Sequence, residues 1–147
     1  MHSVEAEAYF VKGMHSLQNG DTLAAMVSFE KAVKLDEQPV YKSFLAYCLA
    51  RERGQVRQAI AMCEQALEKE PDSTLHYLNL GRIHLVAGNK PEAIRIFRAG
   101  LGQGTNPDII AELDALGTRT PPIFSCLKRD HPLNRYLGII FNRLRWR

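Results

Sequence analysis

Histidines and cysteines are the residues of this 147-residue chain best suited to metal binding or nucleophilic attack. His76 and His84 stand eight residues apart, so on a helix they point roughly the same way. Neither is followed at the third or fourth position by the Asp, Glu or Cys that would complete a ligand set. Cys48 could form a dyad with a histidine, but no spacing in the sequence brings a base to it. We therefore predict no catalytic site, no metal site and no cofactor, and hence a protein that is not an enzyme.

Two further patterns give no chemistry either. The three cysteines are odd in number, widely spaced and without a CxxC pair, which fits neither a disulfide framework nor a zinc site: Cys48, Cys63 and Cys126. We predict that they are reduced thiols. Gly100, Gly102 and Gly104 suggest a phosphate-binding loop, but they follow a predicted helix and lack the Lys-Ser/Thr ending. We expect these glycines to fray the last repeat helix.

The elements that would position all these residues recur every 34 positions. Six columns of the repeat are Gly13/Tyr47/Gly81, Gly20/Gly54/Gly88, Ala25/Ala59/Ala93, Met26/Ile60/Ile94, Phe29/Cys63/Phe97 and Ala32/Ala66/Gly100. A period of 20 to 50 residues is typical of solenoids and other repeat arrays. The repeat, rather than any single motif, therefore determines the predicted fold.

Within each unit the local signals predict two helices joined by a tight turn. The column that begins with Gly20 should end the first helix in a left-handed conformation. Asp21 and Asn89 follow as candidate N-caps of the second helix, and Asp72 and Asp108 as candidate caps further on. Prolines that stop one helix and are tolerated at the start of the next mark the junctions between units: Pro39, Pro71 and Pro107. Small residues in the Gly13 and Ala25 columns should let helices approach closely, with aromatic rings beside them.

These residues resemble the tetratricopeptide repeat family over roughly residues 6 to 107. The third unit matches best and the first matches well, with Lys12 where leucine is usual. The matching residues of these two units are Tyr77, Leu80, Gly81, Gly88, Ala93 and Phe97, then Tyr9, Gly13, Ala25, Phe29 and Ala32. The middle unit departs at Tyr47 and Cys63 but keeps Ala59, Ala66 and Pro71. A pentatricopeptide-type RNA reader has a similar helix pair, but acidic repeats would repel phosphate.

The resemblance implies an all-α solenoid of three helix-turn-helix units. We expect repeats at about 6–39, 40–73 and 74–107, then a capping helix at 108–116, as one domain of residues 1–117. Asp108 would cap that helix, and its apolar stripe would be Ile109, Ile110, Leu113 and Leu116.

The resemblance also implies a concave groove, lined by the first helix of each unit, that takes an extended or helical peptide. We expect its main contacts at Phe10, Met14, Tyr41, Phe44, Cys48, Arg51, Leu75, Asn79 and Arg82. The family's carboxylate clamp is excluded because Phe10, Met14 and Leu45 occupy the places of its first three polar groups. Asn79 and Arg82 could still hold a peptide backbone or an acidic side chain, although solvated surface groups are an alternative reading.

Residues 118–147 differ from the repeats in charge and pattern. They carry seven Lys and Arg against one acid, whereas residues 1–117 carry 12 against 15. Pro121 and Pro122 favour an extended connector. A last helix should begin near Pro132, with one apolar face formed by Leu133, Tyr136, Leu137, Ile140, Phe141 and Leu144. This basic amphipathic helix could dock on its own solenoid, join two copies in a homodimer, or lie on an anionic membrane.

We therefore predict a scaffold or adaptor that binds another protein or a peptide, of an identity that the sequence does not reveal. The alternative is a membrane-surface or self-assembly element acting through the C-terminal helix. Nucleic acid is not expected as a partner. No secretory signal and no run of 18 or more apolar residues are found, which favours a cytoplasmic location.

Overall fold

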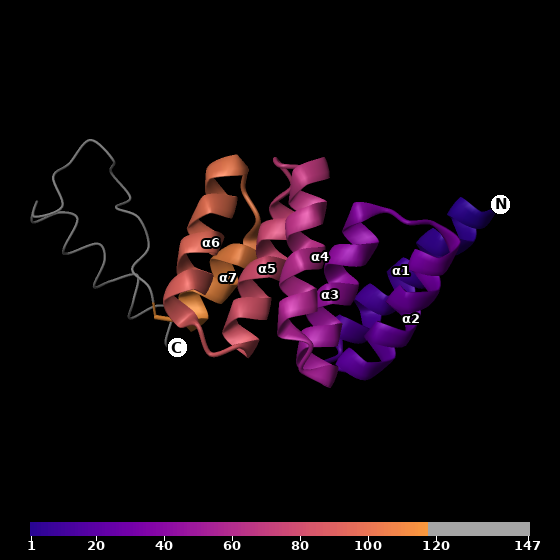
Figure 1. The fold of residues 1–147 in the computed structure, drawn as a ribbon, viewed down its shortest axis with the longest axis horizontal. Helices are drawn as coiled ribbons and strands as arrows, with labels where there is room; N and C mark the ends of the chain where they lie inside the picture. The colour runs from indigo at the N-terminus through magenta and orange to yellow at the C-terminus, as the bar shows by residue number, and fades with distance from the viewer. Residues whose placement is uncertain (118–147) are drawn as a thin grey trace, which may run out of the picture. The chain divides into compact units, whose positions relative to one another are not determined.

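A computed structural model describes residues 1–117, in which seven α-helices and no strand are found (Figure 1). The helices are α1 (His2–Gln18), α2 (Thr22–Leu35), α3 (Pro39–Arg53), α4 (Val56–Lys69), α5 (Thr74–Val86), α6 (Lys90–Gln103) and α7 (Pro107–Ala115). Helices α1 and α2, α3 and α4, and α5 and α6 pack as pairs, and each pair begins and ends close to a predicted repeat. The predicted all-α solenoid of three helix pairs is confirmed.

Turns between paired helices depend on the glycine column. Gly20, Gly54 and Gly88 have φ angles of 78°, 66° and 79°, a conformation that costs glycine nothing but strains residues with a Cβ. Directly after the first of these glycines, the Asp21 carboxylate accepts a hydrogen bond from the Ala24 amide at 3.0 Å. This bond satisfies one of the unpaired amides at the start of α2, as the sequence predicted.

The small-residue columns bring paired helices into close contact. A Cβ added to Gly13 of α1 would lie 2.5 Å from Cε1 of Phe29 on α2, and a Cβ on Gly81 of α5 would collide with the ring of Phe97 on α6. The aromatic ring thus occupies the space left by the absent side chain. The predicted packing of glycine against phenylalanine is confirmed in the first and third units.

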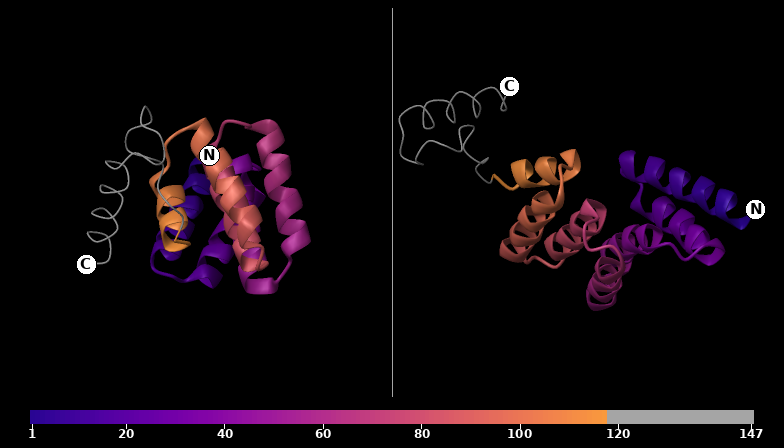
Figure 2. Two further views of the ribbon diagram at one scale, coloured as in Figure 1. Left: turned by 90° about the vertical axis from the view of Figure 1, so that its left-hand side faces the viewer. Right: turned by 90° about the horizontal axis from the view of Figure 1, so that it is seen from above.

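Neighbouring pairs share continuous apolar clusters. One buried cluster joins the first two pairs and contains Ala25, Met26, Phe29, Phe44, Leu45, Cys48 and Leu49. A second joins the last two pairs and contains Ala46, Ala50, Ala59, Cys63, Leu80, Ile83 and Ile96. Figures 1 and 2 show these pairs following one another from α1–α2 through α3–α4 to α5–α6. Each pair buries its apolar surface against the next, which is the source of stability in repeat arrays.

Several predicted details are corrected. Asn89 stands at the N-cap of α6 and Ser73, not Asp72, at that of α5, but neither side chain makes a capping bond. The cap before α7 is Asn106 rather than Asp108: its Oδ1 accepts from the amides of Asp108 at 2.9 Å and Ile109 at 3.4 Å. Asn106 also donates to Thr74 Oγ1 at 3.1 Å, and this second bond holds its side chain in the capping position.

The three glycines near the end of α6 do not fray it as a group. The helix continues through Gly100 and Gly102 to Gln103 and ends at Gly104. Gly100 is buried, and a Cβ there would lie 2.7 Å from Tyr77 Cβ and 2.9 Å from Ile109 Cδ1. Gly100 therefore has a packing role that its place in a glycine-rich run did not reveal.

Residues 1–109 form one compact unit. In α7, Ile109 and Leu113 of the predicted stripe are buried, whereas Ile110 is exposed. The predicted domain boundary at residue 117 stays a prediction. The connector, the basic C-terminal helix and its proposed roles fall on residues 118–147, outside the described part of the chain.

Candidate peptide-binding face

The predicted groove residues come from the first helices of the three pairs, which lie next to one another. Phe10 of α1 contacts Tyr41 and Phe44 of α3, with ring centroids 4.8 and 5.6 Å apart. Helix α3 in turn packs against α5. Helices α1, α3 and α5 therefore form a layer. The side of this layer that carries the nine predicted groove residues is called here the first-helix face.

The nine predicted contacts divide into accessible and buried residues. Phe10, Met14, Leu75 and Arg82 are half-buried and Arg51 is exposed. Four others are buried: Tyr41, Phe44, Cys48 and Asn79. Neighbouring helices cover these four side chains in the structure, and their contact with a ligand stays a prediction.

Aromatic stacking explains the burial of Tyr41 and Phe44. Phe10 lies 5.6 Å from Phe29, and Phe29 lies 5.7 Å from Phe44, so four rings join the first two pairs. Such ring pairs add about 0.5 to 1.5 kcal/mol each beyond the burial of their area. Burial, together with the nearby carboxylates of Asp36 and Glu7, raises the pKa of Tyr41, so its phenol stays protonated.

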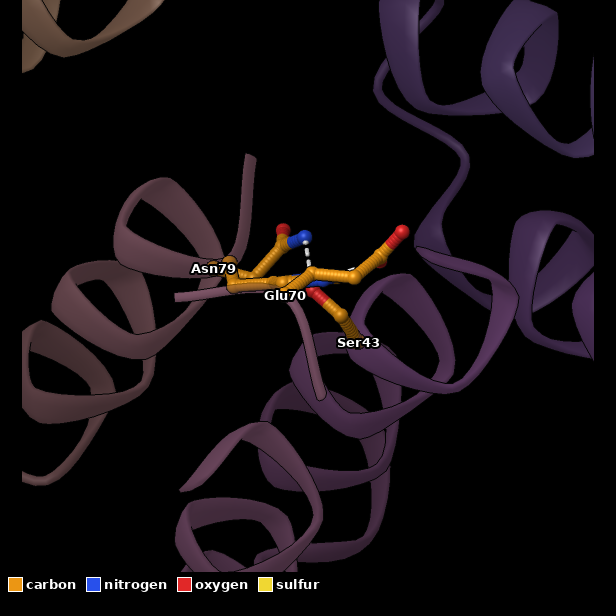
Figure 3. A network of polar contacts seen from close by, with 4 residues as sticks. Ser43, Glu70 and Asn79 are labelled. Carbon is orange, nitrogen blue, oxygen red and sulfur yellow. Dashed lines mark hydrogen bonds and ion pairs between the residues drawn. The ribbon is translucent and has the colours of Figure 1, made fainter. Parts of the chain in front are cut away.

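Asn79 belongs to a buried polar network between the second and third pairs (Figure 3). Its Nδ2 donates to Ser43 Oγ at 2.7 Å, and His76 Nε2 lies 2.8 Å from Glu70 Oε1. Within residues 1–117, Asn79 Oδ1 and His76 Nδ1 are buried without a hydrogen-bond partner. Because the Asn79 amide faces Ser43 and not solvent, it fixes the position of α5 on α3 and is not open to a peptide.

Tyr47 is a residue of the first-helix face that the sequence-based prediction missed. Its hydroxyl accepts a hydrogen bond from Arg51 Nη1 at 3.3 Å, and the Arg82 guanidinium lies 5.7 Å from its ring centroid. A cation at this distance over an aromatic face is attracted by about 0.5 to 1 kcal/mol at exposed sites. The phenol thus brings together two arginines from different pairs.

One sequence signal could have found Tyr47. In the glycine column it is a large residue, and Cys63 is correspondingly small in the phenylalanine column of the same unit. Tyr47 packs against the buried cluster that contains Cys63. The middle pair therefore inverts the large and small partners, which leaves a phenol at the first-helix face.

Cys48 and Cys63 are buried thiols whose environment opposes ionisation. Burial raises the pKa of both to about 12, and Glu52 adds to the effect at Cys48. The thiolate is the reactive form of cysteine, so both side chains should be inert near neutral pH. In the unfolded chain they ionise near their ordinary pKa of 9.0, and their contribution to stability is therefore lost as the pH rises from about 9 to 12.

We predict that a Cys126→Ser variant shows no thiol titratable by a disulfide reagent in the native state at pH 8. After addition of denaturant it should show both Cys48 and Cys63, because unfolding exposes the two thiols. The measurement is the absorbance of the released thiolate. A fast-reacting thiol in the native protein would contradict the burial of these residues.

Within residues 1–117, no three His, Cys, Asp or Glu side chains lie close enough to hold a metal ion. No helix in the same range is long and apolar enough to span a bilayer. The features that distinguish the described part of the chain are therefore its stacked helix pairs and the first-helix face, which define an α-helical repeat protein.

Comparison with known proteins identifies the kind of repeat. Residues 6–39 and residues 45–106 each match a family model described as tetratricopeptide repeat, and together they cover more than half of the chain. The chain belongs to the tetratricopeptide repeat family, as the resemblance indicated.

Relatives and solved structures agree with this assignment. The chain is 30% identical over 93 residues to the photosystem I assembly protein Ycf3 of two Synechococcus strains, a match over 61% of this chain and 54% of each relative. It thus spans about half the length of these curated relatives. A structure described as the first repeat domain of Spaghetti (RPAP3) bound to the HSP90 peptide SRMEEVD is similar with a TM-score of 0.58 and 20% identity, over 78% of this chain and 92% of that one. The structure of the Sgt2 repeat domain from Aspergillus fumigatus is similar with a TM-score of 0.58 and 16% identity, over 88% of this chain and 93% of that one.

Proposed function

We propose that this chain is a non-enzymatic protein-interaction module that binds a segment of another protein across the first-helix face. The observation that carries the proposal is the combination of half-buried apolar residues with an exposed arginine on adjoining helices: Phe10, Met14, Leu75 and Arg51. Partly buried apolar side chains supply contact area, and a guanidinium supplies direction by hydrogen bonding to a carboxylate or carbonyl.

The comparisons with known proteins support this proposal. One solved neighbour holds a peptide with three acidic residues, and the curated relatives are named as assembly proteins. On the face of this chain, Arg51 donates through Nη1 to Tyr47, which leaves other guanidinium donors for a ligand. We therefore expect a bound segment that places an acidic or carbonyl group near Arg51 and an apolar side chain near Met14.

A binding role also fits the chemistry of the buried thiols. Cys48 and Cys63, which stay protonated near neutral pH, are poorly suited to nucleophilic attack. The buried polar network holds one helix on another through Asn79 and Ser43. The buried polar groups thus hold helices together, and the accessible groups are available to bind a partner.

Affinity capture from native lysate with a charge-reversed variant tests the proposal. Arg51→Glu should reduce recovery of the bound proteins about tenfold or more, because loss of a charged hydrogen bond and a new repulsion together exceed about 1.4 kcal/mol. The matched control is Arg57→Glu on α4, which changes the net charge equally at another exposed position. Equal recovery by the intact protein and both variants would show that the first-helix face is not the binding site.

A further inference from the structure

Helix α1 exposes a side whose equivalents on α3 and α5 are buried. The 34-residue period relates Val11 to Leu45 and Asn79, and both of these are buried between helix pairs. Val11 itself is 60% exposed, and Val4 on the same side is 73% exposed. Within residues 1–109 this side of α1, called here the α1 outer face, lacks the helix pair that covers its counterparts on α3 and α5.

The neighbouring columns show the same contrast. Lys12 and His15 of α1 are exposed. The residues in their columns on α3 and α5 are all buried: Ala46, Leu80, Leu49 and Ile83. The α1 outer face is therefore an uncovered side of the described stack, and it carries polar residues in two columns that are apolar on α3 and α5.

The residues of this face form two rows that lie on either side of Ala8. Val4 and Val11, seven positions apart, share one row along the helix, and Glu5 and Lys12 share the next row. Ala8 lies midway between the two ends, is exposed, and has a side chain short enough to let another helix approach closely. One end of the face thus carries Glu5 beside Val4, the other carries Lys12 beside Val11, and Ala8 lies between them.

We propose that the α1 outer face binds the same face of a second copy of this chain, with the two α1 helices antiparallel and the two-fold axis close to Ala8. A two-fold interface requires that residue i of one copy contact residue j of the other and the reverse. The antiparallel arrangement meets this requirement, since Val4 then meets Val11 of the partner copy and Glu5 meets Lys12 of the partner copy. A parallel arrangement would put like charges together at both ends.

Charge complementarity makes a second copy a suitable occupant of the α1 outer face. Glu5 and Lys12 make no ion pair within residues 1–117 and so remain available to a partner. A second copy run in reverse satisfies both ends at once, because it presents Lys12 to Glu5 and Glu5 to Lys12. One helix from each copy buries less area than a stable dimer needs, so the association should be weak and dependent on concentration. This proposal does not use Arg51 or the rest of the first-helix face.

Sedimentation velocity of the full chain at low ionic strength tests the proposal. The weight-average sedimentation coefficient should rise with concentration up to about 1 mM, where a dimer with a millimolar Kd is still populated. Val11→Glu should abolish this rise, because it places a charge at the apolar contact. Val27→Glu on α2 is the matched control: Val27 is 44% exposed, but its counterparts Ala61 and Arg95 are exposed too, so this column is not a packing face. Thermal melting checks that both variants fold.

Exchange of the charges at Glu5 and Lys12 distinguishes a direct contact between copies from a general effect on folding. Glu5→Lys alone and Lys12→Glu alone should each weaken self-association about tenfold, because both contacts become repulsive. The double variant should recover it, since each contact again joins opposite charges. An equimolar mixture of the two single variants should form a heterodimer, because both of its contacts are also attractive.

A chain that stays monomeric at every concentration would overturn the proposal. So would a dimer that persists in Val11→Glu and in both single charge variants, and in particular one that is lost only when residues 131–147 are deleted. Failure of the mixture to associate, with self-association of the unaltered chain intact, would exclude the antiparallel arrangement.

Discussion

Phe29→Ala should lower the free energy of unfolding by about 3 to 5 kcal/mol. The Phe29 ring is fully buried, lies 5.6 and 5.7 Å from the rings of Phe10 and Phe44, and fills the space beside Gly13. Its removal leaves a cavity that these neighbours can fill only by abandoning their own contacts. A domain of this size is stable by about 5 to 15 kcal/mol, so much of the margin would be lost.

Denaturant unfolding followed by circular dichroism measures this effect, and Leu23→Ala provides the control. Leu23 lies on the same helix but is 55% exposed, so its truncation should change the free energy of unfolding by less than about 0.5 kcal/mol. Similar losses in the two variants would mean that burial between helix pairs does not determine the stability of α2, since alanine favours a helix at both positions.

The packing role of Phe29 could be predicted from the sequence because its position recurs in the 34-residue repeat. Phe29 and Phe97 each stand opposite a glycine in the same unit, and a period of 34 residues fixes which side of each helix faces its pair. Backbone signals were predictable for the same reason, because a left-handed residue after a helix requires glycine whatever surrounds it. The number, order and approximate bounds of the helix pairs therefore follow from local residue types.

The exposure of the predicted groove residues was less predictable, because it depends on the neighbouring pair. Tyr41 and Phe44 occupy groove positions of the repeat but are buried, since Phe10 on α1 is large enough to cover them. Asn79 is buried because Ser43 on α3 offers it a hydrogen bond at 2.7 Å. The period assigns a residue to a face, but the size and polarity of side chains on another helix decide whether that face stays open.

Cap residues show the same limit at smaller scale. Asp108 is in sequence a good cap for α7, yet Asn106 takes this role because its amide also donates to Thr74 on α5. That second bond joins residues 32 positions apart, and no local pattern contains it. Local rules thus predicted that the helix would be capped. A long-range contact determined which residue caps it.

Gly81→Ala should destabilise the protein by about 1 to 3 kcal/mol, although alanine is the better helix former. The added Cβ would overlap the ring of Phe97, which is fully buried and cannot move without displacing other core residues. Helix propensity alone predicts the opposite sign, a gain of about 0.5 to 1 kcal/mol. The sign of the change therefore separates close helix packing from backbone entropy as the reason for glycine in this column.

Gly102→Ala and a compensating substitution complete the test by denaturant unfolding. Apart from its chain neighbours and the backbone of its own helix, no atom of residues 1–117 lies within 4 Å of a Cβ built on Gly102, so alanine there should raise the free energy of unfolding by up to about 1 kcal/mol. Combining Gly81→Ala with Phe97→Leu should cost less than the sum of the two single changes by about 0.5 kcal/mol or more, because the smaller side chain makes room for the methyl group. Additive losses would mean that the ring and the glycine do not constrain one another, and the packing rule inferred from the 34-residue columns would then fail at its best-matched unit.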